Sequence, residues 1–271
     1  MLNTASKIKL ARLLYRLLKL AGFHDEQLVT RSGVRYQLDL REGIDLSIFL
    51  FGGFQHHVTA VPPGADDAVI FDVGANIGAI TLPFARRYPR AQVHCFEPTH
   101  YALGKLKLNL ALNPTLAERV VVNPIFVGST SGAVPETQAY ASWRVDGAGG
   151  SAVHDTHLGS KMAAVAVQTS LDDYVKAHDI AKLHMLKIDT DGHELEVLKG
   201  ARQIIATQRP RIVMEMCPYL LRERGLSLAD YADVLGSACR MRDLQSGKVL
   251  DEKFLARLPA GGGIDVLIEP H

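Results

Sequence analysis

Three acidic side chains stand at the ends of apolar runs in this sequence. Asp72 lies near the end of the run 69–73, Glu97 follows the run 92–96, and Asp189 follows the run 183–188. Continuous apolar runs of this length are typical of strands buried on both faces of a parallel sheet. In a doubly wound sheet, ligands bind outside the carboxyl ends of the strands. The three acids are therefore candidates for one ligand site.

The turn after the first of these strands has the sequence DVGANIG, from Asp72 to Gly78. It departs from the dinucleotide pattern G-x-G-x-x-G, because Asn76 replaces the middle glycine and no glycine follows at the third position. A carboxylate at Asp72 would also repel a pyrophosphate and attract a cation. S-adenosylmethionine, which carries an ammonium and a sulfonium but no phosphate, suits this loop better. Glu97 could accept both ribose hydroxyls of that ligand. The alternative is that Asp72 and Glu97 only cap the helices that follow them.

A methyl donor would place the chemistry beside the fourth strand, where the stretch from Asp189 to Glu194 reads DTDGHE. Asp189 ends the strand, so we expect it nearest the sulfonium. His193 has the ordinary pKa best suited to accept a hydroxyl proton near neutral pH. Asp191 is a further candidate for proton transfer. The alternatives are a helix cap at Asp191, a favourable helix dipole at Glu194 and an ordinary surface position for His193.

A second possibility for the same residues is Mg²⁺ bound by Asp189, Asp191 and Glu215, because carboxylates at neighbouring strand ends offer hard oxygen ligands.

Nucleic acid is a poor candidate partner. Methylation of a base amine usually needs a [DN]-P-P-aromatic motif at this strand end, which is absent here, and the net charge of the chain is only +1.

The elements that would position these residues alternate along the chain. We expect strands at 69–73, 92–96, 120–127, 183–188, 211–216 and 264–268, with helices at 78–88, 101–112, 194–206 and 228–238. This alternation predicts an α/β fold with a doubly wound, mostly parallel sheet. The sheet belongs to a domain at 65–271, within which the irregular stretch 128–168 is a candidate substrate lid. Trp143 in that stretch could stack on a sugar or pack in the core. The same stretch also contains Arg144, Asp146, His154 and His157.

An appendage at 1–64 precedes this domain. It has a helix at 8–21 and short strands within 27–54. The leucines of the helix form a stripe with the lysines and arginines largely off it, which predicts packing on the main domain or on a second subunit of a homodimer, or contact with a membrane surface. The chain has 271 residues and three cysteines without metal-ligand or disulfide spacing, which favours a reducing, cytoplasmic setting.

Five stretches of the sequence together resemble the FkbM family of S-adenosylmethionine-dependent methyltransferases. They are DVGANIG at 72–78, FEP at 96–98, VGSTSG at 127–132, TSLDDY at 169–174 and KIDTDGHELEVLKGA at 187–201. The resemblance extends from about residue 43 to about residue 215. It implies a class I methyltransferase fold, with a seven-stranded sheet whose last strand is antiparallel, and O-methylation of a sugar, a polyketide or a related natural product. It also implies that the cofactor residues are Asp72, Gly74, Asn76, Gly78 and Glu97.

The chain departs from the family at Gln55. The family often has an acidic residue at this place, after a G-x-[FY] pattern, so the positioning role of that acid is open here and His56 and His57 are candidates to replace it. Two other functions are alternatives to methyl transfer: a nicotinamide-dependent oxidoreductase on a similar sheet, and a non-catalytic protein that binds S-adenosylmethionine.

Overall fold

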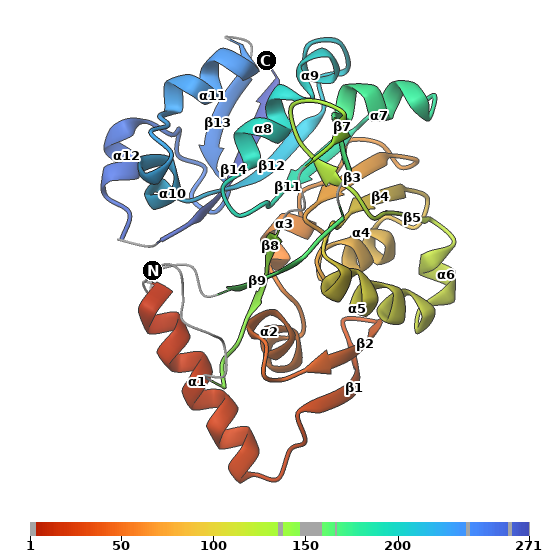
Figure 1. Cartoon of the computed structure of the whole chain (residues 1–271), viewed down its shortest axis with the longest axis vertical. Coiled ribbons are helices and arrows are strands. Elements are labelled where there is room, and N and C mark those ends of the chain that lie inside the picture. The colour runs from red at the N-terminus through yellow and green to blue at the C-terminus, as the bar shows by residue number, and fades with distance from the viewer. Residues whose placement is uncertain are drawn as a thin grey trace.

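The computed structural model describes the backbone of residues 4–134, 138–146, 159–165, 167–236, 239–259 and 262–270. Its centre is a seven-stranded sheet with the order β13-β14-β12-β11-β3-β4-β5 (Figure 1). In this sheet β14 runs antiparallel to the two strands beside it, and all the other strand pairs are parallel. The predicted fold class, including the antiparallel last strand, is therefore confirmed. The strands are β3 (Val69–Val73), β4 (Gln92–Phe96), β5 (Val120–Asn123), β11 (Met185–Ile188), β12 (Arg211–Met216), β13 (Cys239–Asp243) and β14 (Ile264–Pro270).

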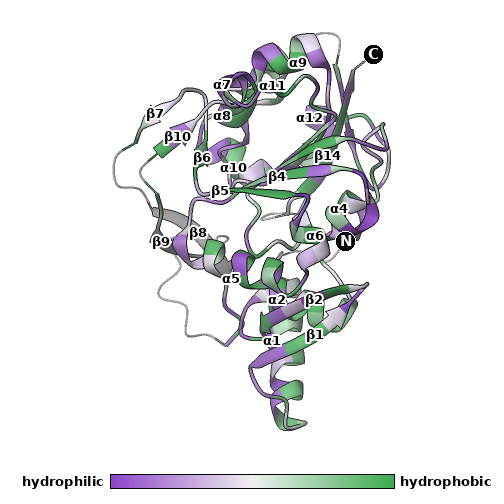
Figure 2. Ribbon diagram, turned by 90° about the vertical axis from the view of Figure 1, so that its right-hand side faces the viewer, coloured by the Kyte–Doolittle hydropathy of each residue, from purple (hydrophilic) through white to green (hydrophobic). Residues whose placement is uncertain are grey.

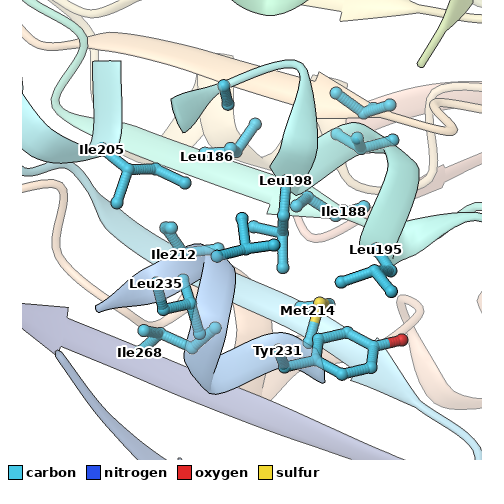
Figure 3. Packing of buried hydrophobic residues seen from close by; sticks show 14 of the residues in the cluster. Leu186, Ile188, Leu195, Leu198, Ile205, Ile212, Met214, Tyr231, Leu235 and Ile268 are labelled. Carbon is cyan, nitrogen blue, oxygen red and sulfur yellow. The ribbon is translucent and has the colours of Figure 1, made fainter. Parts of the chain in front are cut away.

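Helices cover both faces of this sheet, and the strands between them are largely apolar (Figure 2). One face packs on α7 (Leu171–Ala177), α8 (Glu194–Lys199), α9 (Arg202–Gln208) and α11 (Leu228–Leu235). Figure 3 shows this core, where Leu195 and Leu198 of α8 meet Met214 of β12. The other face packs on α4 (Thr81–Arg87) and α5 (His100–Ala111). The short helices are α6 (Pro114–Ala117), α10 (Pro218–Glu223) and α12 (Glu252–Ala256).

The alternation of side chains along the strands decides which polar groups share a face. Phe71, Leu186 and Met214 point to the α8 face. Their neighbours in sequence must point to the α4 face, because successive side chains of a strand alternate. Asp72 of β3 and Lys187 of β11 are register partners, and both therefore point to the α4 face. The same alternation places the first polar residues of the site on the α4 side of the sheet.

The appendage differs in part from its prediction. The strands β1 (Glu26–Arg31) and β2 (Val34–Asp39) form the expected hairpin, but residues 43–51 form a helix, α2 (Gly43–Phe51), and α3 (His56–Thr59) follows. The expectation of strands throughout 27–54 was wrong, because a short apolar run does not distinguish a buried helix from a strand. Buried Asp45 of α2 lies 2.6 Å from Lys105 of α5, which ties the appendage to the main domain.

The N-terminal helix α1 (Thr4–Leu20) forms as expected. Ala11, Tyr15 and Leu18 pack against Leu40, Leu46 and Val145, while the other side of the predicted stripe is exposed at Leu10, Leu13 and Leu17. The leucine stripe of α1 is therefore wider than the surface formed by Leu40, Leu46 and Val145, and only part of the stripe is buried. No helix in the described part of the chain has the length and hydrophobicity required to cross a membrane.

The stretch 128–168 contains more regular structure than predicted. The expected strand at 120–127 is two strands, since β6 (Phe126–Val127) leaves the main sheet and pairs with β10 (Val167–Thr169), which also pairs with β7 (Gly132–Ala133). A hairpin forms from β8 (Gln138–Trp143) and β9 (Gly159–Ala163). His154, His157 and the side chain of Trp143 lie outside the described residues, and the lid stays a prediction.

Two helix predictions need smaller corrections. The helix predicted at 78–88 begins at Thr81, so Pro83 lies in its first turn, where a proline is tolerated. The helix predicted at 194–206 is divided into α8 and α9 around Gly200. A Cβ at that position would lie 2.0 Å from the carbonyl oxygen of Gly128, so the chain turns where another segment packs closely. Strand β13 was not predicted.

Candidate active site

The loop after β3 is pressed against the end of β11. Gly74 has a φ of +78°, and a Cβ on it would lie 1.8 Å from the carbonyl oxygen of Asp189. Gly78 and Asn76 also have positive φ, of +87° and +50°. Asparagine tolerates this conformation better than most residues. The three residues of the predicted motif thus share a left-handed backbone, and at Gly74 the close contact between the two strand ends also excludes a side chain.

Beneath this loop lies a buried ion pair between Asp72 and Lys187. The ammonium of Lys187 is 3.0 Å from Oδ1 of Asp72 and donates to the carbonyl oxygen of Gly74 at 3.0 Å. The hydroxyl of Thr81 donates to the other carboxylate oxygen at 2.5 Å. Although desolvation lowers the pKa of Lys187, the carboxylates of Asp72 and Asp189 raise it further, so the lysine is charged. The carboxylate of Asp72 therefore has protein partners, and its direct contact with a ligand stays a prediction.

Lys187 was not assigned a role from the sequence. The available signal was a lysine between two apolar residues, Leu186 and Ile188, in a strand that had to be buried on both faces. A buried lysine is rare unless it is paired. The sequence pattern therefore called for a carboxylate on a neighbouring strand, and only the register shows that it is Asp72.

Glu97 lies beside the same loop at the end of β4 and is buried. Its Oε2 accepts from the backbone N–H of Asn76 at 2.8 Å, and its Oε1 accepts from the N–H and hydroxyl of Thr99 at 2.9 and 2.6 Å. Thr99 is the N-cap residue of α5, so Glu97 does stabilise that helix start. Burial raises the pKa of Glu97. A carboxylate has about four acceptor positions, so roughly one remains for a ligand hydroxyl.

A cluster of carboxylates occupies the ends of β11 and β12. Burial raises the pKa of Asp189, which the ammonium of Lys187 only partly offsets. Burial and the neighbouring Asp189 carboxylate raise the pKa of Glu215 well above its usual range. Burial, and then Asp189 and Glu194, raise the pKa of Asp191 to about 7. Packed this closely, the ionised groups repel one another, so the cluster favours a bound cation.

The predicted Mg²⁺ ligands belong to this cluster. In the part of the chain that the structure describes, no three His, Cys, Asp or Glu side chains have the arrangement of a metal site. Magnesium binding by Asp189, Asp191 and Glu215 therefore stays a prediction without preformed geometry.

Glu194 and His193 lie at the start of α8. Glu194 is buried, and its Oε1 accepts from the backbone N–H groups of Thr190 and Gly192 at 3.0 and 2.9 Å, so it holds the turn in shape. His193 is exposed, with its Nε2 3.1 Å from a guanidinium nitrogen of Arg224. Partial desolvation and this cation lower the pKa of His193. Its contacts are with Arg224 rather than with the carboxylates, and its role as a base stays a prediction.

Replacing Asp191 with asparagine is expected to stabilise the protein more at pH 8 than at pH 5. The folded-state pKa of about 7 exceeds the unfolded value of 3.8, so this carboxyl group lowers stability progressively as pH rises between these values. Asparagine resembles the protonated acid and tolerates the φ of +51°. Melting temperatures at pH 5 and pH 8 would measure the difference. Exposed Asp179, also at +51°, is the control, and an equal effect of D191N at both pH values would contradict the expectation.

A cavity of about 230 Å³ opens beside the carboxylate cluster, on the side of the appendage. The residues lining it are Phe54, Gln55, His57, Glu215, Asp243, Gln245, Gly263, Ile264 and Asp265. Of the two histidines predicted to replace the family's acid, His57 lines the cavity and lies 2.5 Å from Asp265, whereas His56 is exposed. The sequence prediction missed Asp243 and Asp265, since both lie in the C-terminal strands and far from any recognised motif.

The chain is similar to known methyltransferases. Residues 72–239 match the model of the Methyltransferase FkbM domain. The methyltransferase sdnD of Sordaria araneosa is 25% identical over 209 residues, which are 65% of this chain and 80% of that protein. The hexuronic acid methyltransferase AglP of Haloferax volcanii is 30% identical over 138 residues, half of each chain. The 2-O-methyltransferase NoeI of Sinorhizobium fredii is 24% identical over 180 residues, which are 63% of this chain and 72% of that protein.

Proposed function

The chain belongs to the FkbM family of methyltransferases, and we propose that it uses S-adenosylmethionine to methylate a hydroxyl group of a sugar, a polyketide or a related natural product. The names of two relatives support an oxygen or sugar acceptor, since one is a 2-O-methyltransferase and another acts on a hexuronic acid. The family membership makes the chain an enzyme, which disfavours the oxidoreductase and the non-catalytic alternatives.

The observation that carries this proposal is the charge at the ends of β4, β11 and β12. The carboxylates of Glu97, Asp189, Asp191 and Glu215 gather there, while Lys187 is already paired with Asp72. A pyrophosphate would be repelled by this cluster, whereas the sulfonium and ammonium of S-adenosylmethionine would be attracted. When bound, that molecule supplies a methyl group already activated for displacement by an oxygen nucleophile.

The described residues would contribute position and charge to this reaction. Gly74 allows the loop to approach the end of β11, Glu97 has an acceptor position for a ribose hydroxyl, and Asp189 lies where a sulfonium would be stabilised. Alignment of nucleophile and methyl carbon is the main requirement of such a displacement. A base must also take the hydroxyl proton. Mg²⁺ at Asp189, Asp191 and Glu215 is a possible further aid that we keep as a prediction.

Calorimetric titration with S-adenosylmethionine, S-adenosylhomocysteine and NAD tests the cofactor. We expect the first two to bind and NAD not to bind. Glu97→Gln should weaken both by about 10–100-fold, because a hydrogen bond to a charged group contributes roughly 1.5–3 kcal/mol. Glu118→Gln, at an exposed position, is the matched control. Binding of NAD alone would contradict the proposal, as would unchanged affinity in a folded Glu97→Gln variant.

The proposed partners are small-molecule or glycan acceptors, without nucleic acid, in a cytoplasmic setting. Contact of α1 with a second copy of the chain or with a membrane surface also stays a prediction. The exposed Leu10, Leu13 and Leu17 make α1 the surface at which to look for it.

A further inference from the structure

The cavity borders the proposed site of methyl transfer at Glu215. Glu215 lines the cavity, and its carboxylate interacts with that of Asp189 at the end of the neighbouring strand β11. In the sheet, Glu215 is the register partner of Asp265, another lining residue. Gly263 makes room for this carboxylate, because a Cβ on it would lie 3.1 Å from Oε1 of Glu215. A molecule in the cavity would therefore lie next to the residues expected beside the sulfonium.

Two buried acceptors on the cavity wall lack partners. The Oδ1 atom of Asp243 and the Oε1 atom of Gln55 have no hydrogen-bond partner, although both are buried. Asp243 is only 3% exposed, and its other oxygen already accepts from the backbone N–H of Ser246 at 2.8 Å. A buried acceptor left unpaired destabilises the folded state. Two of them on one cavity indicate a ligand that donates hydrogen bonds, through hydroxyl or ammonium groups.

The charge of the cavity restricts the ligand further. The lining includes the carboxylates of Glu215, Asp243 and Asp265, and none of the described lining residues is a lysine or an arginine. An anionic ligand would be repelled by these groups. Phe54 and Ile264 add apolar side chains to a wall that is mostly polar. The volume of about 230 Å³ is smaller than the roughly 300–1,000 Å³ of typical ligand pockets, which suits a single ring.

His57 is oriented within this cavity by Asp265. Its Nε2 lies 2.5 Å from Oδ2 of Asp265. An ionised carboxylate can only accept, so Nε2 carries the proton, and in the neutral ring Nδ1 has the free lone pair. No contact of Nδ1 with another described residue competes for that lone pair. Val58 and Thr59, the next residues of α3, are buried and anchor the histidine.

We propose that this cavity binds the methyl acceptor, that the acceptor is a neutral or cationic polyhydroxylated molecule, and that Nδ1 of His57 takes the proton of its reacting hydroxyl. This inference rests on the proposed function. In the step, the acceptor oxygen forms a bond to the methyl carbon, the carbon–sulfur bond breaks with its electron pair left on sulfur, and the hydroxyl proton moves to Nδ1. The carboxylate of Asp265 stabilises the resulting imidazolium.

The acceptor class is tested by binding to the full chain saturated with S-adenosylhomocysteine. The probes are the methyl glycosides of glucose, glucosamine and glucuronic acid, which are neutral, cationic and anionic sugars of similar size. We expect the first two to bind at least tenfold more tightly than the third. Equal or tighter binding of the glucuronide would overturn the charge argument. Failure of all three to bind would overturn the assignment of the cavity to a sugar-like acceptor.

The base is tested with His57→Asn, and the neighbouring exposed His56→Asn is the matched control. We expect His57→Asn to bind S-adenosylmethionine within about twofold of the wild type and to lower kcat for the sugar that binds by about 10²–10³-fold. The fall of wild-type rate at acid pH should disappear in this variant. The charged groups facing His57 are Asp265, Glu215 and Asp243, and Asp265→Asn should lower kcat without removing the acid limb entirely.

The outcomes separate this inference from the proposed function. A wild-type protein that does not bind S-adenosylmethionine refutes the proposed function itself. A wild type that binds the cofactor, with His57→Asn equal to it in kcat and pH profile, overturns the role of His57 alone. A wild type that binds the cofactor and a sugar without methylating that sugar overturns the assignment of the cavity to the methyl acceptor.

Discussion

Replacing Gly74 with alanine is expected to abolish binding of S-adenosylmethionine and to lower the melting temperature by roughly 10 °C. The new Cβ would lie 1.8 Å from the carbonyl oxygen of Asp189, and the backbone has a φ of +78°. Left-handed backbone costs an L-residue about 1–2 kcal/mol and overpacking about 1–3 kcal/mol, and each kcal/mol lowers Tm by about 2–4 °C in a domain of this size. To relieve the clash, the loop must move away from the end of β11. The cofactor is predicted to bind between these two segments, so its binding should be lost.

Gly64→Ala is the matched control for this variant. Gly64 has a similar φ of +92°, but a Cβ on it would have no atom within 4 Å. It should therefore show only the backbone cost of about 1–2 kcal/mol. Calorimetric melting and cofactor titration of both variants measure the difference. If Gly74→Ala loses no more stability than Gly64→Ala and still binds the cofactor, the tight contact between the two strand ends is unimportant.

Replacing Lys187 with methionine is expected to lower the free energy of unfolding by about 3–5 kcal/mol, because it leaves the buried carboxylate of Asp72 without its counter-charge. Lys187 is 3% exposed and Asp72 is completely buried. The lysine also donates to the carbonyl oxygen of Gly74, so the cofactor loop should loosen as well. Chemical denaturation at pH 7 measures the loss of stability, and titration with S-adenosylmethionine measures the effect on the loop.

The double variant Lys187→Met with Asp72→Asn is the control for this prediction. Removing the Asp72 charge as well leaves only the more distant partner of Lys187, Asp189 at 3.8 Å, without its counter-charge, so the double variant should be more stable than Lys187→Met alone. Asparagine at position 72 can still accept from the hydroxyl of Thr81. If the two single losses simply add in the double variant, the two residues are not coupled and the explanation of Lys187 is wrong.

Local pattern was sufficient to locate the strands and the loop. The predicted bounds of β3, β4 and β12 agree with the structure, because each is an apolar run buried on both faces and bordered by turn residues. Pro83 lies in the first turn of α4, where a missing N–H breaks no helical hydrogen bond. The doubly wound, mostly parallel sheet followed from the order of these elements, whereas its seven strands and antiparallel last strand followed from the family resemblance.

Packing decided the elements for which local pattern was ambiguous. The run 43–51 could have been a strand, and it is a helix because Asp45 reaches Lys105 across 60 residues of chain and the apolar side chains pack under β2. The hairpin β8–β9 joins segments whose pairing depends on a partner distant in sequence. Contacts between residues far apart in the chain produce no local hydrophobic periodicity, so they cannot be predicted from the sequence pattern.

The sequence by itself determined which residue types the site contains, whereas tertiary structure decided which of them meet. The motifs placed Asp72, Glu97 and Asp189 at strand ends, because strand ends are local features. Only the register pairs Asp72 with Lys187, and only the antiparallel β14 brings Asp265 to His57 from 208 residues away. Side-chain partners across a sheet depend on strand order and register, and these are set by the burial of the whole core rather than by any one segment.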